Sequence, residues 1–179
     1  MQVTSFTKQK KLKPLHKIFR HKGLLETFNT INKANGKVAL VGGVVRSILL
    51  KEKIIENNTI FDLATNLQPK QIIKIFKNNQ IKYIDNGIKH GTVTLKVQGL
   101  NIEVTSLRKD IVSKGRYADV VFHENWEVDA KRRDLTINAI YIDPLGNIYD
   151  PVDGTKDLFN KRVEFIGDMS ERIKEDYLR

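Results

Sequence analysis

Two acidic residues, Asp62 and Glu103, lie in segments whose patterns predict β-strands. Around Glu103 the alternation points Ile102 and Val104 to one side of a strand and Glu103 and Thr105 to the other. Carboxylates on neighbouring strands can share divalent cations, and a two-metal site stabilises the attacking and leaving oxygens of a phosphoryl transfer. The alternative interpretation is a solvent-facing pair on the polar side of a sheet.

A glycine pair, Gly42-Gly43, follows a short apolar run and precedes a helical pattern that carries Arg46 one turn in. Backbone N–H groups and the positive end of a helix can hold a phosphate at such a turn. The alternative is a tight strand-to-helix turn that needs glycine for its geometry alone. Neither a P-loop nor a dinucleotide-binding fingerprint is present in the sequence.

Two further segments combine cationic, acidic and amide groups. Residues 132–139 contain Arg133, Asp134 and Asn138, a set that suits a triphosphate and a ribose, although an Arg-Asp pair beside a helix start also occurs as surface pairing. Near the C-terminus, the spacing puts Glu175 and Arg179 one helical turn apart with Asp176 beside them. That trio forms either a surface ion pair or a set that reads the edge of a nucleotide base, since a carboxylate accepts from an amino group and a guanidinium donates.

The elements that must position these groups follow from the hydrophobic patterns. Strands and helices alternate, with one hairpin between them, which predicts an α/β (α+β) fold with a mixed sheet flanked by helices and a helical part beginning at the C-terminus. We expect helices from Pro14 to Asn35-Gly36, after Gly43, from Pro69 through Phe76 and after the capping residue Asp168; strands at 37–41, 60–63, 92–97 and 102–105; a loop-like stretch at 108–130; and a segment at 135–142 that begins helical and ends as a strand.

Composition narrows the class of protein. The chain has 179 residues, a formal net charge of +10 and no cysteine, so disulfides, thiolate zinc sites and thiol nucleophiles are excluded. No apolar stretch approaches the roughly 20 residues that span a bilayer, and we expect a cytoplasmic protein without a membrane partner. The basic run from Lys8 to Lys22 is either a solvated tail or a phosphate contact, and the positive charge favours polyanions such as RNA or nucleotides.

Taken in order, the motifs resemble those of the bacterial-type (class II) tRNA nucleotidyltransferase (CCA-adding enzyme) and poly(A) polymerase family, over about residues 24–179. Residues 41–46 look like its glycine-glycine-x-valine-arginine motif, and residues 62–65 look like the second half of its Asp-x-Asp metal motif. The remaining matches are its hairpin (87–93 and 103–108), its Arg-Arg-Asp-x-Thr-x-Asn-Ala motif (131–139), the turn that follows (149–158) and the motif ending in Glu-Asp-x-x-Arg (162–179).

The resemblance implies a DNA polymerase beta-like nucleotidyltransferase fold that transfers CMP or AMP from CTP or ATP to an RNA 3′ end, most simply that of a tRNA, with Mg²⁺ or Mn²⁺. Family members carry out CCA addition or polyadenylation, and the sequence does not separate these. Site roles carried over from the family are catalysis and metal binding for Asp62 and Glu103, and nucleotide binding for Gly42, Gly43, Arg46, Arg133, Asp134, Asn138, Glu175, Asp176 and Arg179.

Three departures from the family pattern stand out. Ile60 occupies the first position of the Asp-x-Asp metal motif, Ser47 replaces the Asp that usually follows Val-Arg, and the chain ends at Arg179. The expected organisation is a basic extension (1–23), a nucleotidyltransferase head (24–150), and a linker with the start of a truncated helical neck (151–179). We therefore expect impaired transfer. The alternatives are a non-catalytic nucleotide- or RNA-binding remnant, or one piece of a split enzyme completed by a second polypeptide.

Overall fold

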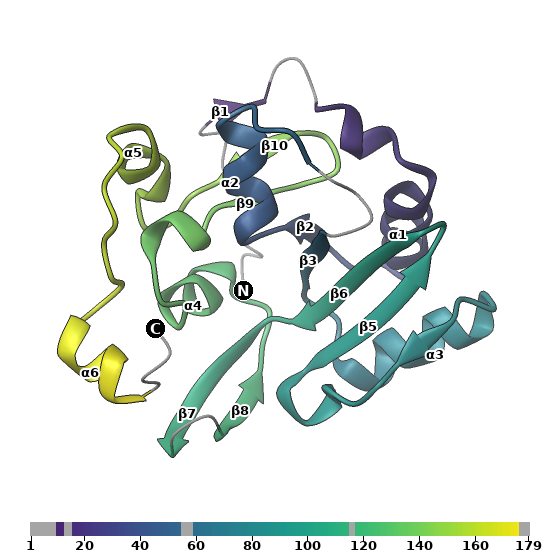
Figure 1. Ribbon diagram of the computed structural model, residues 1–179. Coiled ribbons are helices and arrows are strands. Elements are labelled where there is room, and N and C mark those ends of the chain that lie inside the picture. The colour runs from purple at the N-terminus through teal and green to yellow at the C-terminus, as the bar shows by residue number, and fades with distance from the viewer. Residues whose placement is uncertain (1–9, 13–15, 55–58, 115–116, 176–179) are drawn as a thin grey trace.

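The computed structural model describes residues 10–12, 16–54, 59–114 and 117–175 and contains one large mixed sheet with helices packed against it (Figure 1). Within those residues the large sheet has eight strands, in the order β1-β10-β9-β2-β3-β6-β5-β4. They are β1 (Lys10–Lys11), β2 (Val38–Leu40), β3 (Ile60–Thr65), β4 (Tyr83–Ile84), β5 (Thr92–Val97), β6 (Leu100–Ser106), β9 (Tyr141–Ile142) and β10 (Asn147–Tyr149). A second ladder pairs β7 (Arg108–Lys114) with β8 (Tyr117–Phe122).

The helices are short, with 6 to 12 residues each. They are α1 (Lys22–Lys33), α2 (Gly43–Leu49), α3 (Pro69–Asn78), α4 (Trp126–Lys131), α5 (Gly154–Phe159) and α6 (Met169–Glu175), with 3-10 turns η1 (Lys17–Arg20), η3 (Ile88–His90) and η4 (Thr136–Asn138). In the described part of the chain, no helix is both long and apolar enough to cross a bilayer.

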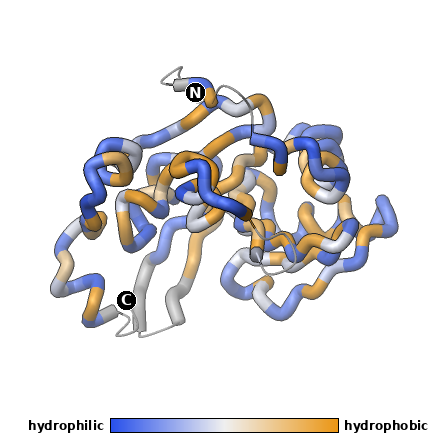
Figure 2. Tube along the Cα trace, turned by 45° about the horizontal axis from the view of Figure 1, so that its top comes forward, coloured by the Kyte–Doolittle hydropathy of each residue, from blue (hydrophilic) through white to orange (hydrophobic). Residues whose placement is uncertain are grey.

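The two faces of the sheet carry separate cores, because side chains alternate along each strand. Val38 and Leu40 of β2 join the larger core, which α1, α2 and α3 cover, whereas Ala39 between them joins a smaller core around Trp126 and Tyr141. Figure 2 shows the resulting hydrophobic strands in the interior of the molecule. The smaller core fixes α4 over the second face of the sheet.

One parallel pair decides which acidic residues meet. β3 and β6 run parallel with Asp62 directly beside Glu103, while β5 and β6 form an antiparallel hairpin. The predicted hairpin is confirmed, and so are the helix that begins at Pro69 and the N-cap at Asp168, whose Oδ1 accepts from the Glu171 N–H at 2.9 Å. The mixed sheet flanked by helices is confirmed as well.

The prediction of a loop over residues 108–130 is wrong. The structure places β7, β8 and α4 there. A register shift between Asp110 and Val112 breaks the alternation that would reveal β7, and α4 has 6 residues, too few to display a helical period. Strands β4 and β10 and helix α5 also lie where no such element was predicted, and each is similarly short.

The single helix predicted from Pro14 to Asn35-Gly36 is two elements in the structure, with residues 13–15 outside the described part. Its break lies at His21, which is extended (ψ 130) and accepts from the Gly23 N–H through Nδ1 at 3.1 Å, so it caps α1. The preceding turn η1 buries Ile18 and Phe19 in the larger core. Part of the predicted extension therefore packs against the head, and the boundaries at residues 23 and 150 stay a prediction.

Candidate active site

Asp62 and Glu103 form the acidic centre of the site. They are cross-strand neighbours on β3 and β6, and both point to the face opposite the larger core because Phe61, Leu63 and Ile102 fill that core. Burial, reinforced by the Glu103 carboxylate, raises the pKa of the Asp62 carboxyl to about 6 against the opposing charge of Arg133. Two adjacent carboxylates in a partly buried position favour binding of a cation, which would relieve their repulsion.

The glycine turn lies against this carboxylate. Gly42 has φ +77, a conformation that side chains with a Cβ rarely adopt, and a Cβ added there would lie 3.0 Å from Asp62 Oδ2. Gly43 then begins α2, which places Arg46 one turn in, and the Arg46 guanidinium donates to Asn138 Oδ1. The turn therefore needs glycine at position 42 for its backbone geometry, and this geometry also brings the backbone beside the Asp62 carboxylate.

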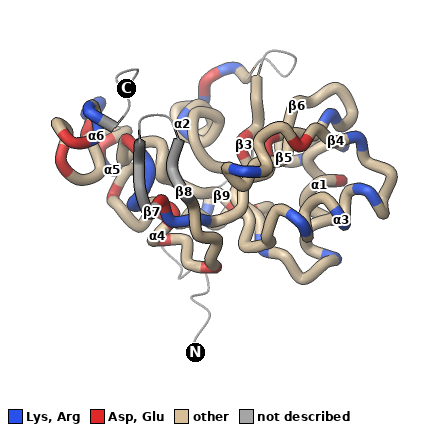
Figure 3. Tube along the Cα trace, turned by 90° about the horizontal axis from the view of Figure 1, so that it is seen from below, with Lys and Arg blue, Asp and Glu red and all other residues tan. Residues whose placement is uncertain are grey.

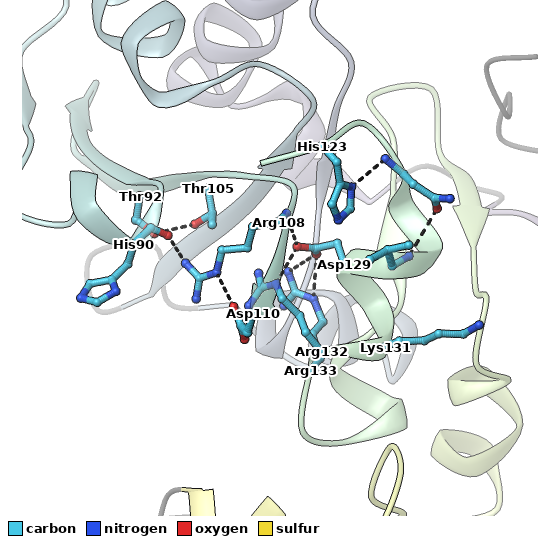
Figure 4. A network of polar contacts seen from close by, with 12 residues as sticks. His90, Thr92, Thr105, Arg108, Asp110, His123, Asp129, Lys131, Arg132 and Arg133 are labelled. Carbon is cyan, nitrogen blue, oxygen red and sulfur yellow. Dashed lines mark hydrogen bonds and ion pairs between the residues drawn. The ribbon is translucent and has the colours of Figure 1, made fainter. Parts of the chain in front are cut away.

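A buried carboxylate that the sequence analysis did not select organises the cationic side of the site. Asp129 of α4 is 1% exposed and accepts from Arg132 Nε at 2.8 Å and from Arg133 Nη2 at 3.2 Å (Figure 4). Asp129 accepts from the Tyr141 hydroxyl as well, at 2.8 Å. It also accepts from the Arg108 N–H at 3.3 Å, where β7 begins. Burial pushes the pKa of Asp129 upward, but Arg133 and Arg132 hold that pKa below its ordinary value.

The role of Asp129 could have been predicted from its spacing in the sequence. Asp129 precedes Arg132 by three residues and Arg133 by four, and helical spacing of this kind brings a carboxylate beside both guanidinium groups. Trp126 packs edge-on against Tyr141 with ring centroids 5.4 Å apart, and the Arg133 guanidinium carbon lies 5.4 Å from the Tyr141 ring centre. The Arg133 head group is therefore fixed by an ion pair, a hydroxyl and a ring together.

The segment that contains Asp134 and Thr136 is held by the chain that follows. The Asp134 carbonyl accepts from the Ile166 N–H at 2.8 Å, and the Thr136 hydroxyl donates to Asp157 at 2.7 Å. Gly154 is needed at this contact, because a Cβ there would lie 2.1 Å from the Thr136 carbonyl oxygen. Segments 134–136 and 164–166 are thus locked side by side, which fixes the base of the site.

These groups surround one cavity of about 470 Å³, a size suited to a nucleotide. It is lined by Gly42, Gly43, Arg46, Asp62, Arg108, Asp110, Arg132, Arg133, Asp134 and Asn138. Seven predicted site residues are in that lining, and Glu103 lies beside Asp62. Of the remaining predictions, Glu175 ends α6 in the described backbone, whereas Asp176 and Arg179 lie outside the described residues.

Arg108 and Asp110 are the lining residues that the loop prediction concealed. Arg108 forms an ion pair with Asp110 at 3.4 Å and donates to the His90 carbonyl (Figure 4). Burial, followed by the charge of Arg132, lowers the pKa of Arg108. Several guanidinium groups thus crowd one side of the cavity, an arrangement that favours a polyanionic ligand.

The acidic side fits a divalent cation less completely. Oxygen ligands suit Mg²⁺, and the adjoining carboxylates of Asp62 and Glu103 supply them. No cluster of three or more His, Cys, Asp or Glu side chains suited to a metal occurs among the residues that the structure describes. The position that would add a carboxylate on the same face of β3 is Ile60, which is 52% exposed.

The sheet, the glycine turn and the paired carboxylates together define a nucleotidyltransferase head. The family model of the poly A polymerase head domain matches residues 38–164. The chain therefore belongs to the poly A polymerase head domain family, as its motifs predict.

Individual relatives agree with this assignment. The human mitochondrial CCA tRNA nucleotidyltransferase 1 is 40% identical over 158 residues, covering 88% of this chain and 36% of that protein. The CCA-adding enzyme of Lactobacillus johnsonii is 40% identical over 161 residues, covering 87% and 37%. Among solved structures, the Bacillus stearothermophilus CCA-adding enzyme in complex with CTP superposes with a TM-score of 0.77 at 32% identity, covering 92% of this chain and 37% of that one. The chain thus spans little more than a third of the relatives it matches.

Proposed function

We propose that this chain is the head of a template-independent RNA nucleotidyltransferase that binds CTP or ATP and transfers CMP or AMP to the 3′ end of an RNA, with tRNA as the natural substrate. The observation that carries the proposal is the cavity whose lining combines Asp62, the Gly42-Gly43 turn and the guanidinium groups of four arginines. The names of the relatives, which include CCA-adding enzymes and a structure with CTP, support the choice of substrates.

The nucleotide would lie with its triphosphate toward the guanidinium groups. Arg46, Arg132 and Arg133 present N–H donors to the cavity, and the buried Asp129 behind them keeps two of the three in fixed positions. Asp134 and Asn138 on the adjoining segment provide acceptors and an amide for the ribose and the base. Glu175, Asp176 and Arg179 are proposed to read the base edge, which would distinguish cytosine and adenine.

Transfer requires the RNA 3′-hydroxyl oxygen to attack the α-phosphorus while the bond to the β-phosphate breaks and pyrophosphate leaves. Mg²⁺ or Mn²⁺ held by Asp62 and Glu103 would favour loss of the hydroxyl proton and neutralise charge on the transferred phosphate. Glu103, which pairs with Asp62 on the neighbouring strand, is proposed to orient the hydroxyl.

Ile60 limits this activity. In the Asp-x-Asp pattern the first position would provide a ligand shared between two cations, and an apolar side chain cannot. Loss of that ligand would cost several orders of magnitude in rate, because each ~1.4 kcal/mol of transition-state stabilisation is worth tenfold. The alternative, favoured by Ile60, is a nucleotide- and RNA-binding module with little turnover, either as a remnant or as part of a split enzyme completed by a second polypeptide.

The test is incorporation of labelled CTP and ATP onto tRNA that lacks its 3′-terminal CCA, with Mg²⁺ or Mn²⁺, for the chain and for Ile60→Asp. Calorimetric titration with CTP is run in parallel on both. The proposal expects CTP binding by both proteins and transfer that rises strongly in Ile60→Asp. Binding without transfer in either would favour the binding module, and absence of CTP binding in either would refute the nucleotide site itself.

A further inference from the structure

The face of the sheet that carries Asp62 is covered unevenly. Over β9, β2 and β3 it packs against the smaller core with Trp126 and Tyr141. Across β6, β5 and β4 the same face bears side chains that remain partly or fully exposed. The strand register makes these a straight row, since Asp62 pairs with Glu103, Glu103 with Thr94 and Thr94 with Ile84. Ile84, at the outer end on β4, is 43% exposed.

A second row lies one repeat along the strands and ends in positive charge. Ile60 pairs with Asn101, and Asn101 pairs with Lys96, whose N–H donates to the Lys82 carbonyl at 3.4 Å. Both lysines are exposed. Like charges on adjacent strands repel and destabilise the pairing unless an anion lies between them. A negatively charged partner would relieve the repulsion between these two lysines.

The edge strand also borders a groove. It has a volume of about 510 Å³ and is lined by Lys77, Lys82 and Lys96 together with Gln80, Ile81, Tyr83 and Ile84. Its lining includes no carboxylate, and none of the three lysines forms an ion pair with any residue that the structure describes. Figure 3 shows Lys and Arg gathered around β4 and α3. Of these residues, Lys82, Ile84 and Lys96 lie on the face that carries Asp62, whereas Tyr83 packs against the larger core and Lys77 lies on α3. Two cations beside an exposed aliphatic side chain suit a strand of nucleic acid, which offers phosphates and the apolar faces of its bases.

The distance from the carboxylates matches this use. Two strand spacings separate Glu103 on β6 from β4, which is about 10 Å. Phosphates of one stacked strand recur every ~3.4 Å along its axis, so the lysines would meet backbone phosphates about three nucleotides before an end placed at Glu103.

We propose that Lys82 and Lys96, with Ile84 beside them, form the path of the RNA substrate strand, which crosses the open face of β4 and β5 and delivers its 3′ end to Glu103. This rests on the proposed function, because it takes Asp62 and Glu103 as the reaction centre. The path is distinct from the nucleotide cavity, whose lining shares no residue with the groove.

The experiment measures binding of fluorescein-labelled tRNA lacking its CCA end by anisotropy, at several salt concentrations between about 50 and 200 mM. The full chain is compared with Lys82→Ala/Lys96→Ala and with Lys70→Ala/Lys74→Ala. The second double variant removes the same charge from exposed positions of α3, which packs on the opposite face of the sheet. CTP binding is measured for all three proteins.

We expect Lys82→Ala/Lys96→Ala to weaken tRNA binding roughly tenfold and to lower the slope of log affinity against log salt by about 1.4, the value for two contacts with single-stranded phosphates. The α3 variant should change both much less, and CTP binding should be unaffected in each. A tRNA carrying 4-thiouridine three nucleotides before its 3′ end should crosslink to the segment 82–84.

Equal losses in the two double variants would show that the charge acts non-specifically and would overturn the proposal, as would unchanged tRNA binding in Lys82→Ala/Lys96→Ala. In the second case the groove would be open to a protein partner instead. If CTP fails to bind while Lys82→Ala/Lys96→Ala still weakens tRNA binding, the nucleotide site is refuted and the RNA path is supported. Thermal melts confirm folding, and removal of the like-charge pair should leave the melting temperature unchanged or raise it.

Discussion

Ile60 and Asp62 lie on the same face of β3, separated by one residue, with Ile60 beside Asn101 and Asp62 beside Glu103 on the parallel strand. Since Ile60 is half exposed, an acidic side chain would be accepted there with little change in packing, and it would stand next to the existing pair of carboxylates.

Ile60→Asp should therefore create a cation site. We expect Mn²⁺ affinity to rise at least tenfold, while the free energy of unfolding changes by about 0.5 kcal/mol, as is usual for exposed positions. Isothermal titration with Mn²⁺ and urea unfolding measure the two quantities. Ile60→Asn is the matched control, with the same shape and no charge; equal Mn²⁺ affinity in the Asp and Asn variants would refute the assignment of β3 and β6 as the metal-binding strands.

Ionised Asp62 should lower the free energy of unfolding of the metal-free protein near neutral pH. Its pKa is about 6 in the folded chain against an ordinary value of 3.8, so the folded state binds the proton more tightly. The contribution of protonated Asp62 to the free energy of unfolding is fully present below about pH 4 and is lost as the pH rises through 6. Asp62→Asn should thus raise the free energy of unfolding by about 1–2 kcal/mol at pH 7.5 and by little at pH 4, after allowance for partial exposure.

Urea unfolding at both pH values, without divalent cations, measures this difference. Glu124→Gln, which neutralises an exposed carboxylate outside the active-site cavity, serves as the control. A gain of the same size at pH 4 and pH 7.5 would show that the effect of Asp62→Asn does not come from its ionisation.

Asp129→Asn should destabilise the chain by about 3–5 kcal/mol, because it removes the charge that compensates two arginines in a buried position. CTP affinity should fall as Arg132 and Arg133 lose their fixed orientation. On the same helix, Glu127→Gln breaks an exposed ion pair with Lys131 and should cost under about 1 kcal/mol. Thermal melts and CTP titration distinguish the two, and similar small effects in both variants would contradict the role given to Asp129.

Gly42→Ala should weaken cation binding at Asp62 through direct contact, in addition to straining the backbone. Both Gly42 (φ +77) and Gly99 (φ +82) have positive φ, so alanine at either is strained, by about 1–3 kcal/mol at Gly42, whose ψ of −148 lies close to a region that is nearly restricted to glycine. Only at Gly42 would the new Cβ press on Asp62; nothing lies within 4 Å of the corresponding atom at Gly99. We expect Mn²⁺ binding in the Ile60→Asp background to be weakened by Gly42→Ala and retained in Gly99→Ala, measured by the same titration. Equal retention would mean that the glycine serves the turn only.

Local patterns were sufficient for the elements with clear periodicity. The alternation over 92–97 predicts β5, the apolar run before Gly42 predicts β2, and Asp168 with Glu171 marks the start of α6. In these cases neighbouring residues alone determine which side chains are buried or which N–H is capped. The family, too, follows from ordered motifs in the sequence.

The tertiary structure decided which residues meet. Nothing local indicates that β3 and β6 pair in parallel with Asp62 opposite Glu103, because the two residues are 41 apart in sequence and α3, β4 and β5 lie between them along the chain. The same holds for Asp129, whose carboxylate became an organising group only when Tyr141 and the start of β7 closed around it. The sequence by itself therefore determined the short-range elements and the chemical types in the site. The long-range pairing and the burial that set the pKa values of Asp62 and Asp129 depended on the assembled sheet, since desolvation is a property of all the surrounding segments together.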